Sequence, residues 1–265
     1  LTWSTSDLTR ISGNGTFRLD STTEDIQTEI RLNYRSTDGA FQFTPGVIAR
    51  WIDQDFEWDF FGPGPATDDR LSLGIYGEGL IRITPKLNVV AGLRYQREAQ
   101  DRDGILALNT PDTLSNPTTI DFDESFDAIL PRISVDYDVT DGVNIGFIAA
   151  RGITPGGFSF VRPANGEGRS DGVTPFALPE YDSETRWVYE AFLRSSFLDN
   201  RVELTANIFY TDFDGLQLLE RVEFAPDLFG SVVRNAESGE TYGLELALNA
   251  NVTSWLDVSG SLGLV

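Results

Sequence analysis

The sequence contains no cysteine, no histidine and no methionine. Without cysteine there are no disulfides, thiolate nucleophiles or cysteine-ligated metals. Without histidine, the serine–histidine and cysteine–histidine hydrolase mechanisms and the usual zinc sites are excluded. Paired carboxylates of the glycosidase kind stay open, because 41 residues are Asp or Glu. No pair stands out among so many acids, so we expect a protein that is not an enzyme and carries no cofactor.

Long apolar runs are also missing, because no segment of about 18 apolar residues could form a transmembrane helix. The formal net charge is −21 and Lys and Arg do not cluster, so we expect no nucleic-acid partner. The acids fit either a solvated protein surface or wet loops around a barrel. The absence of an initiator methionine, and an alternating run that stops at 259–265, lead us to expect a fragment of a longer chain.

What the chain does have is alternation of apolar and polar residues. Between Val202 and Tyr210 every even position is apolar, whereas Glu203 and Thr205 lie on the other face. A period of two is typical of β-strands, because successive side chains point to opposite faces. Alternation alone fits both a soluble sandwich and a membrane barrel. The same pattern occurs in residues 87–96, 132–139 and 242–251.

The lengths of the connections decide between these two folds. Short connections at one end of antiparallel strands and long ones at the other are typical of outer-membrane barrels, whereas Greek-key sandwiches mix lengths at both ends. We therefore predict an all-β fold, an antiparallel transmembrane β-barrel of which this chain forms about 10–11 strands. The expected strands are 25–35, 40–52, 70–83, 87–98, 125–139, 143–152, 181–197, 201–213, 231–252 and 256 onward; the short connections are 36–39, 84–86, 140–142, 198–200 and 253–255, and the long ones 53–69, 99–124, 153–180 and 214–230.

Aromatic residues and prolines add detail to this prediction. Aromatic residues gather near the expected strand ends, as in the interfacial girdles of membrane barrels. Two prolines, Pro45 and Pro131, fall inside expected strands, and we expect each to mark a bulge or a later strand start. The aromatic residues are Trp51, Trp58, Phe60, Trp187, Tyr189 and Trp255.

Four strings in the second half, spanning about 151–246, resemble the TonB-dependent receptor family in content and order. In the second string Ala191 stands where the family has Gly, and Arg194 where it has Lys. Leu93-Arg94-Tyr95 and Pro131-Arg132-Ile133 resemble the family more loosely. The strings are Arg151-Gly152-Ile153-Thr154-Pro155-Gly156-Gly157-Phe158; Glu184 to Ser195 with Tyr189-Glu190; Phe209-Tyr210-Thr211-Asp212-Phe213-Asp214-Gly215-Leu216-Gln217 after the turn Leu198-Asp199-Asn200-Arg201; and Asn235-Ala236-Glu237-Ser238-Gly239 with Tyr242-Gly243-Leu244-Glu245.

The resemblance implies a bacterial outer-membrane receptor with a plugged barrel of about 22 strands. Residues 1–265 would be part of that barrel domain, without the plug and the closing strands. It implies import of a scarce nutrient, typically a ferric siderophore, with outer-membrane lipid, TonB and a small-molecule metal chelate as partners. A passive porin-like channel and a soluble all-β carbohydrate-binding or hydrolytic domain remain the alternatives.

Candidate ligand contacts are the aromatic and arginine residues of the long connections, which suit an aromatic, anionic chelate. The two glycines before Phe158 are explained more simply by a turn at a strand end. We expect no metal site in the acidic groups Asp121, Asp123 and Glu124 or 53–59, which do not match a calcium loop. The expected ligand contacts are Trp58, Phe60, Phe158, Phe160, Arg162 and Arg169, among loop residues that also include Phe61 and Phe176.

Four charged residues are predicted to face the lumen of the barrel: Glu190, Arg194, Glu203 and Glu245. Glu190 and Arg194 share parity, opposite to the apolar Tyr189, Ala191 and Leu193. We expect these charges to form ion pairs with neighbouring strands, for example with Glu203 or Arg201 across the turn.

Overall fold

The computed structural model describes residues 2–12, 15–59, 63–106, 117–159, 178–225 and 228–265, and within these ranges the regular structure is entirely β. No helix long and apolar enough to cross a membrane occurs in them. The strands are β1 (Thr2–Ser12), β2 (Gly15–Arg31), β3 (Tyr34–Arg35), β4 (Phe41–Asp59), β5 (Pro63–Thr84), β6 (Leu87–Leu106), β7 (Thr118–Thr140), β8 (Val143–Thr154), β9 (Gly157–Phe158), β10 (Glu180–Tyr181), β11 (Glu184–Phe197), β12 (Val202–Ala225), β13 (Leu228–Thr253) and β14 (Leu256–Leu264).

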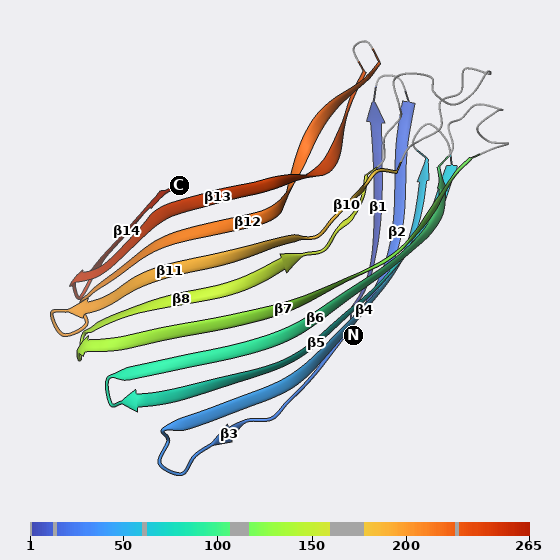
Figure 1. Cartoon of the computed structure of the whole chain (residues 1–265). Coiled ribbons are helices and arrows are strands. Elements are labelled where there is room, and N and C mark those ends of the chain that lie inside the picture. Colours follow the sequence, from blue (N-terminus) through green and yellow to red (C-terminus); the bar gives the residue numbers. More distant parts are fainter. Residues whose placement is uncertain (1, 13–14, 60–62, 107–116, 160–177, 226–227) are drawn as a thin grey trace.

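All but two of these strands form one 12-stranded antiparallel sheet. Its order, β1-β2-β4-β5-β6-β7-β8-β11-β12-β13-β14, follows the chain, and β3 pairs beside β4. The remaining strands, β9 and β10, pair only with each other. The predicted all-β antiparallel fold is confirmed, and the sheet does not close on itself, as expected for part of a larger barrel (Figure 1).

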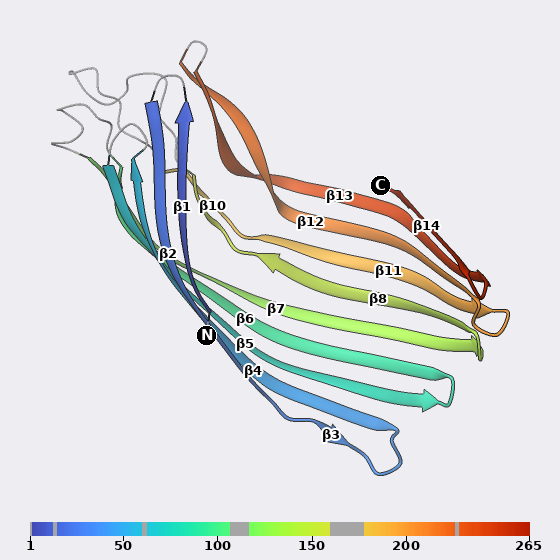
Figure 2. The same ribbon diagram turned by 180° about the vertical axis from the view of Figure 1, so that it is seen from behind.

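Tight turns gather at one end of the sheet, as both views show (Figures 1 and 2). The turn between β11 and β12 is the most demanding one, because Leu198, Asp199 and Asn200 all have positive φ, from 54° to 62°. The left-handed region costs a residue with a Cβ about 1–2 kcal/mol. Three such residues in succession make this the most strained turn in the described chain.

Three of the four connections that we expected to be long are mainly strand. In the first, β4 continues to Asp59 and β5 begins at Pro63. In the second, β6 continues to Leu106 and β7 begins at Thr118, and in the third β12 continues to Ala225 and β13 begins at Leu228. Beyond Trp51 the parity of β4 reverses, with Asp53 and Asp55 at outer positions and Phe56 at an inner one, so the pattern of the lower part of the strand stops although the ladder continues. For the same reason we missed β1 and the first part of β2, which is rich in Ser, Thr and Asp. Of the fourth connection, 153–180, the described residues 155–159 and 178–180 lie outside the 12-stranded sheet, as predicted.

The expectation for the two prolines is wrong, because the register is continuous through both of them. Pro45 pairs with Gly77, and its missing N–H lies opposite the break between β2 and β3, where Leu32 donates to the Pro45 carbonyl at 3.0 Å. Pro131 pairs with Leu93 on β6 and comes one residue before the β7–β8 ladder begins, at Arg132. In both cases proline occupies a position where no ladder donor is needed.

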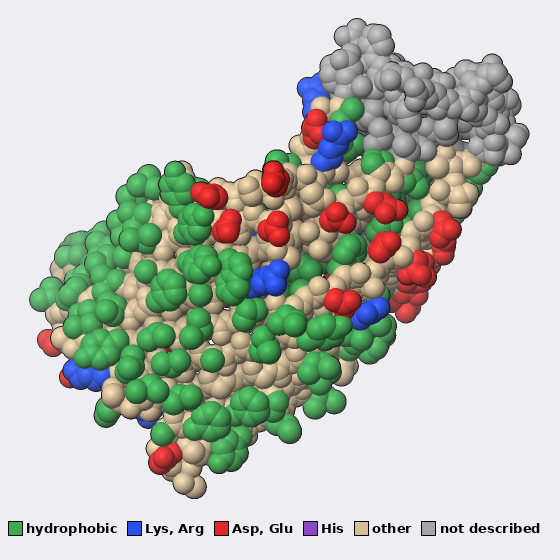
Figure 3. Space-filling model, in the orientation of Figure 1, with side chains coloured by type: hydrophobic (Ala, Val, Ile, Leu, Met, Phe, Trp, Pro, Cys, Tyr) green, Lys and Arg blue, Asp and Glu red, His purple; other side chains and the backbone are tan. Residues whose placement is uncertain are grey.

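The register places an alternating set of apolar residues from β2, β4–β8 and β11–β14 on one face, which we call the outer face. From Phe41 to Trp51 the band covers eleven residues of β4, about 33 Å along the strand and roughly 23 Å at a tilt of about 45°. This matches the apolar belt of about 25 Å in membrane barrels. The space-filling view shows the band, with acids above it (Figure 3). Representative members are Ile30, Val47, Ile75, Leu93, Ile133, Phe147, Ile208, Leu248 and Leu262, all exposed by more than 40%.

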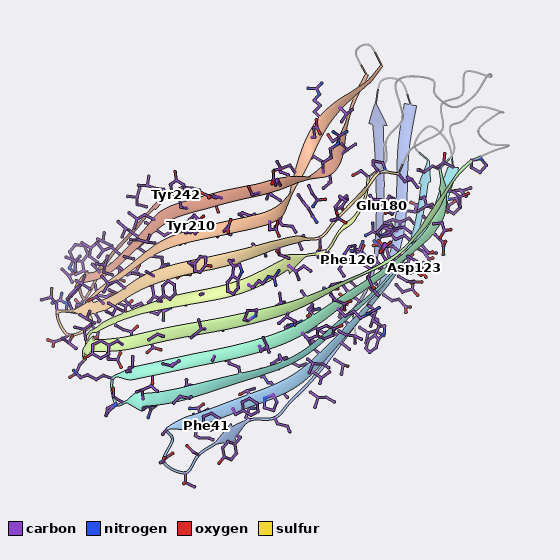
Figure 4. The ribbon with its side chains drawn as sticks, in the orientation of Figure 1. Phe41, Asp123, Phe126, Glu180, Tyr210 and Tyr242 are labelled. Atoms are coloured by element: carbon purple, nitrogen blue, oxygen red, sulfur yellow. The ribbon has the colours of Figure 1, made fainter. Side chains whose placement is uncertain are left out.

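Aromatic side chains border this band on the side of the strand extensions. The rings of Trp187 and Tyr189 stack at 6.1 Å, and Tyr189 stacks on Tyr210 at 6.2 Å. Tyr210 is the direct cross-strand partner of Tyr242, and Figure 4 shows the two side by side. Trp255 is 80% exposed at the opposite border, in the turn before β14. These positions agree with the predicted girdles for Trp51, Trp187, Tyr189 and Trp255.

Candidate ligand site on the inner face

The inner face of the sheet carries several polar pairs. Arg50 makes two hydrogen bonds to Asp25, at 2.9 and 2.7 Å, and Asn88 donates to Asp136 at 2.9 Å. The register places Glu190, Arg194, Glu203 and Glu245 on this face, opposite to the apolar band.

The expected ion-pair ladder among these four residues is absent from the described residues. The guanidinium of Arg194 lies instead over the Phe192 ring, with Cζ 4.6 Å from the ring centroid. Arg201 donates to the backbone carbonyls of Asn251 at 3.1 Å and Val252 at 2.5 Å. Arg201 therefore connects the β11–β12 turn to the β13–β14 end of the sheet by hydrogen bonds.

A short segment leaves the sheet after β8 and folds onto the inner face. We call it the strap; it comprises residues 155–159 and 178–183, including β9 and β10. A Cβ on Gly156 would lie 2.4 Å from the Tyr181 carbonyl oxygen and 2.7 Å from the Phe126 ring. A Cβ on Gly157 would lie 2.7 Å from the Tyr181 hydroxyl. Both glycines therefore allow the strap to lie close to β7 and its own two strands to lie close to each other. Both have negative φ, so they do not form a left-handed turn. Figure 4 labels Phe126 and Glu180 in this region.

Side chains of β12 and β13 hold both ends of the strap. The Gln217 amide donates to the carbonyls of Pro155 at 2.9 Å and Asp182 at 3.0 Å. Asn235 accepts from the Asp182 backbone N–H at 2.7 Å and donates to the Asp182 carbonyl at 3.0 Å. Glu184, which is 6% exposed, accepts from the Gln217 backbone N–H at 2.9 Å. The four family-like strings, far apart in sequence, thus meet in one hydrogen-bonded group.

The other side of the strap packs on β6 and β7 near the ends of these strands. The rings of Phe158 and Phe122 are 5.1 Å apart, and the Arg102 guanidinium lies 5.4 Å from the centroid of Phe158. Phe122 and the neighbouring Ile120 are 4% and 2% exposed. This is the most buried apolar region that the structure describes, so the core lies beneath the strap.

Next to Phe158, two arginines of the wall share one carboxylate. Arg70 makes two hydrogen bonds to Asp68, one of 2.8 Å to Oδ1 and a shorter one to Oδ2. The Nε of Arg102 lies 3.0 Å from Asp68 Oδ2. Burial raises the pKa of Asp68, but the hydrogen bonds from Arg70 and the charges of the two arginines outweigh it and hold the pKa below its usual value. The triad carries one net positive charge.

Gln100 completes this group as the cross-strand neighbour of Arg70. It is 8% exposed and its Oε1 has no hydrogen-bond partner among the described residues. The Nε of Arg102 is also buried and makes no hydrogen bond there, since the N–H does not point at the Asp68 oxygen that it approaches. Gln100 Oε1 is thus a buried acceptor without a partner, and the buried Arg102 Nε meets only a poorly aligned carboxylate oxygen.

The outer face above the apolar band carries a row of acids across five neighbouring strands. Glu24, Asp53, Asp69, Asp101 and Asp123 are successive cross-strand partners. Burial and then the neighbouring carboxylates raise the pKa of Asp69, and the same causes raise that of Asp101. No group of three or more acids in the described ranges is arranged to hold a metal ion.

The positions of the sequence-predicted ligand contacts are only partly described. Phe158 lies in the strap and contacts Phe122 and Arg102. Trp58 lies in β4, but its side chain is not among those described. Phe60, Phe61, Phe160, Arg162, Arg169 and Phe176 lie outside the described residues.

Sequence reasoning missed Asp68, Arg70, Gln100 and Arg102, three of which fall in connections that we expected to be loops. Asp68-Asp69-Arg70 and Gln100-Asp101-Arg102 do carry a usable signal. In each tripeptide an acid on the outer face separates two polar residues that share the inner face.

The family model "TonB dependent receptor-like, beta-barrel" matches residues 2–264. Among solved structures, the ferric yersiniabactin uptake receptor FyuA from Yersinia pestis is similar at 18% identity and a TM-score of 0.74, over 97% of this chain and 37% of that one. The siderophore receptor PiuA from Acinetobacter baumannii is 18% identical, with a TM-score of 0.63 over 94% of this chain and 39% of its own. The copper transporter OprC is 13% identical, with a TM-score of 0.68 over 94% of this chain and 38% of its own.

At these identities the structural likeness shows the fold alone, whereas the family model covers almost the whole chain. The family consists of transport receptors of the outer membrane. The chain spans less than half the length of the solved receptors. It belongs to the TonB-dependent receptor family, as part of the wall of an outer-membrane β-barrel.

Proposed function

We propose that this wall belongs to a TonB-driven importer of a scarce metal chelate, and specifically of a ferric siderophore. The observation that carries the proposal is the arginine pair Arg70 and Arg102 on the inner face, at the loop end and beside the aromatic Phe158. Guanidinium groups and aromatic rings recognise anionic, oxygen-rich chelates. Of the receptors that share the fold, FyuA is named for ferric yersiniabactin uptake and PiuA is named a siderophore receptor.

In this proposal the chain supplies wall and ligand contacts rather than the energy-coupling parts. Residues 1–265 form a continuous part of one barrel domain, and the plug, the closing strands and the TonB contact lie in other parts of the protein. The role is transport and not catalysis. A passive porin-like channel is the alternative within the same architecture, and the soluble carbohydrate-binding alternative is not supported by the apolar outer face.

Growth under iron limitation tests the proposal. A strain that lacks the full-length receptor should fail to grow on one anionic ferric chelate from a panel of citrate, hydroxamate and catecholate chelates, and a plasmid copy should restore growth. An Arg102→Gln copy, checked for normal amount and heat-dependent gel mobility, should restore growth only at a higher chelate concentration. Equal growth of the deletion strain on every chelate would contradict the proposal.

A further inference from the structure

We propose that the strap is held at β12–β13 and covers, with Phe158, a polar binding site for a hydroxycarboxylate group, formed by Arg70, Gln100 and Arg102. The proposal deepens the proposed function, since it rests on an anionic chelate as the ligand. It concerns described residues only: the strap itself and the inner face of β5 and β6.

The two sides of the strap differ in how well their polar groups are satisfied. At β12–β13, Gln217, Asn235 and Glu184 make hydrogen bonds of 2.7–3.0 Å to the strap or to one another. Ser159 adds another, because its Oγ accepts from the Val233 backbone N–H at 2.9 Å. This side is therefore the fixed one.

On the β6 side, contact between the strap and the wall is made through rings and leaves polar atoms unpaired. Phe158 packs on Phe122 and over Arg102, while Gln100 Oε1 and the Arg102 Nε–H beside it have no hydrogen-bond partner among described residues. A buried polar group without a partner costs about 1–3 kcal/mol, whereas an aromatic pair contributes only about 0.5–1.5 kcal/mol beyond its buried area. The β6 side is therefore the one that a ligand can displace.

The free atoms define the chemistry of the ligand. Gln100 Oε1 needs a donor, which a hydroxyl group provides, and the guanidinium of Arg102, which shares Asp68 with Arg70, can bind a further carboxylate. Asp68 neutralises one of the two arginine charges and leaves the other for this carboxylate. Glu124 is exposed and lies directly across from Gln100 on β7. Its carboxylate lowers the net positive charge of the site.

Thiol labelling tests this inference without knowledge of the natural ligand. Because the chain has no cysteine, Gln100→Cys introduces a single thiol here, in a full-length receptor whose other cysteines, where present, are replaced. The probes are an anionic sulfonatoethyl and a cationic trimethylammonium methanethiosulfonate. Ser134→Cys, on the inner face of β7 away from the strap, is the matched control.

We expect the Gln100→Cys thiol to react slowly, and Phe158→Ala to accelerate the reaction on the order of tenfold, as loss of one ring contact allows. Gln217→Ala should accelerate it as well, because each end of the strap loses one of its hydrogen bonds. Neither change should affect Ser134→Cys. Equal rates with and without Phe158 would show that the strap does not cover the site.

The charge of the site is measured by the ratio of anionic to cationic reaction rates. This ratio should be several-fold higher at Gln100→Cys than at Ser134→Cys, and Arg102→Gln should lower it to the control value. If Gln100→Cys does not fold, Glu124→Cys reports the same ratio from an exposed position. A ratio no higher than that of the control overturns the proposed site. Labelling requires no transport, so failure of the uptake function and failure of this site give different results.

Discussion

Asp69 of β5 and Asp101 of β6 are direct cross-strand partners on the outer face, one level above the apolar band. Like charges in this relationship destabilise a sheet, and Asp53 and Asp123 extend the row on either side. The aromatic border and the acidic row follow each other closely, so the acids lie where the wall leaves the hydrocarbon layer.

Asp101→Asn is expected to stabilise the full-length receptor by removing one charge from the row. The pKa values of Asp69 and Asp101 are raised, so the ionised groups oppose folding at pH above the folded-state pKa, and this opposition disappears as the pH falls through it. The midpoint of thermal unfolding in detergent should therefore rise at about pH 8 and change little at about pH 4. High salt should reduce the gain. A lower midpoint at the higher pH would contradict this assignment.

Asp68→Asn is expected to destabilise the full-length receptor, because the Asp68 carboxylate interacts with two arginines. The lowered pKa of Asp68 means that its stabilisation is present above the unfolded-state pKa and is lost as the pH falls through the folded-state pKa. We expect a loss of roughly 2 kcal/mol near neutral pH, less than for a fully buried pair because Arg70 is partly exposed. Chemical unfolding of the refolded barrel measures it. The control is Glu220→Gln, which breaks an exposed ion pair with Arg234 and should cost little.

Gly146 on the inner face leaves room for the ring of Phe192. A Cβ at this position would lie 2.2 Å from Phe192 Cζ and 2.8 Å from the Val135 carbonyl oxygen. Gly146→Ala should therefore cost about 1–3 kcal/mol by overpacking, and Phe192→Ala should reduce that cost without removing it. Gly260→Ala, which meets nothing within 4 Å, is the control and should be close to neutral. Strict additivity of the Gly146 and Phe192 changes would show that the ring is not the obstacle.

Within the apolar band the fold follows from the sequence, because one face meets lipid and the other water. Val202 to Tyr210 alternate for that reason and are paired with β13 in the expected parity. Above the band the parity reverses, with Asp53 and Asp55 at outer positions and the buried Phe122 at an inner one, so the pattern of the band does not extend to the ends of the strands.

The strap could not be predicted, because it depends on contacts over long separations in the chain. Gln217 bonds to Pro155 across 62 residues, and Ser159 to Val233 across 74. The family-like strings indicated that these residues matter, but not that they meet. Likewise, Arg70 and Arg102 become neighbours only through the β5–β6 register, which places Arg102 directly opposite Asp68, two residues before Arg70.

Energised uptake tests the central claim most directly. Cells that produce the full-length receptor are supplied with the radioiron form of the chelate that restores their growth, with and without a proton uncoupler. We predict accumulation of iron in the receptor-producing cells that stops when the uncoupler is added, and no accumulation in cells without TonB. Receptor-dependent iron entry that continues unchanged in the absence of TonB would contradict the account and would identify the barrel as a passive channel.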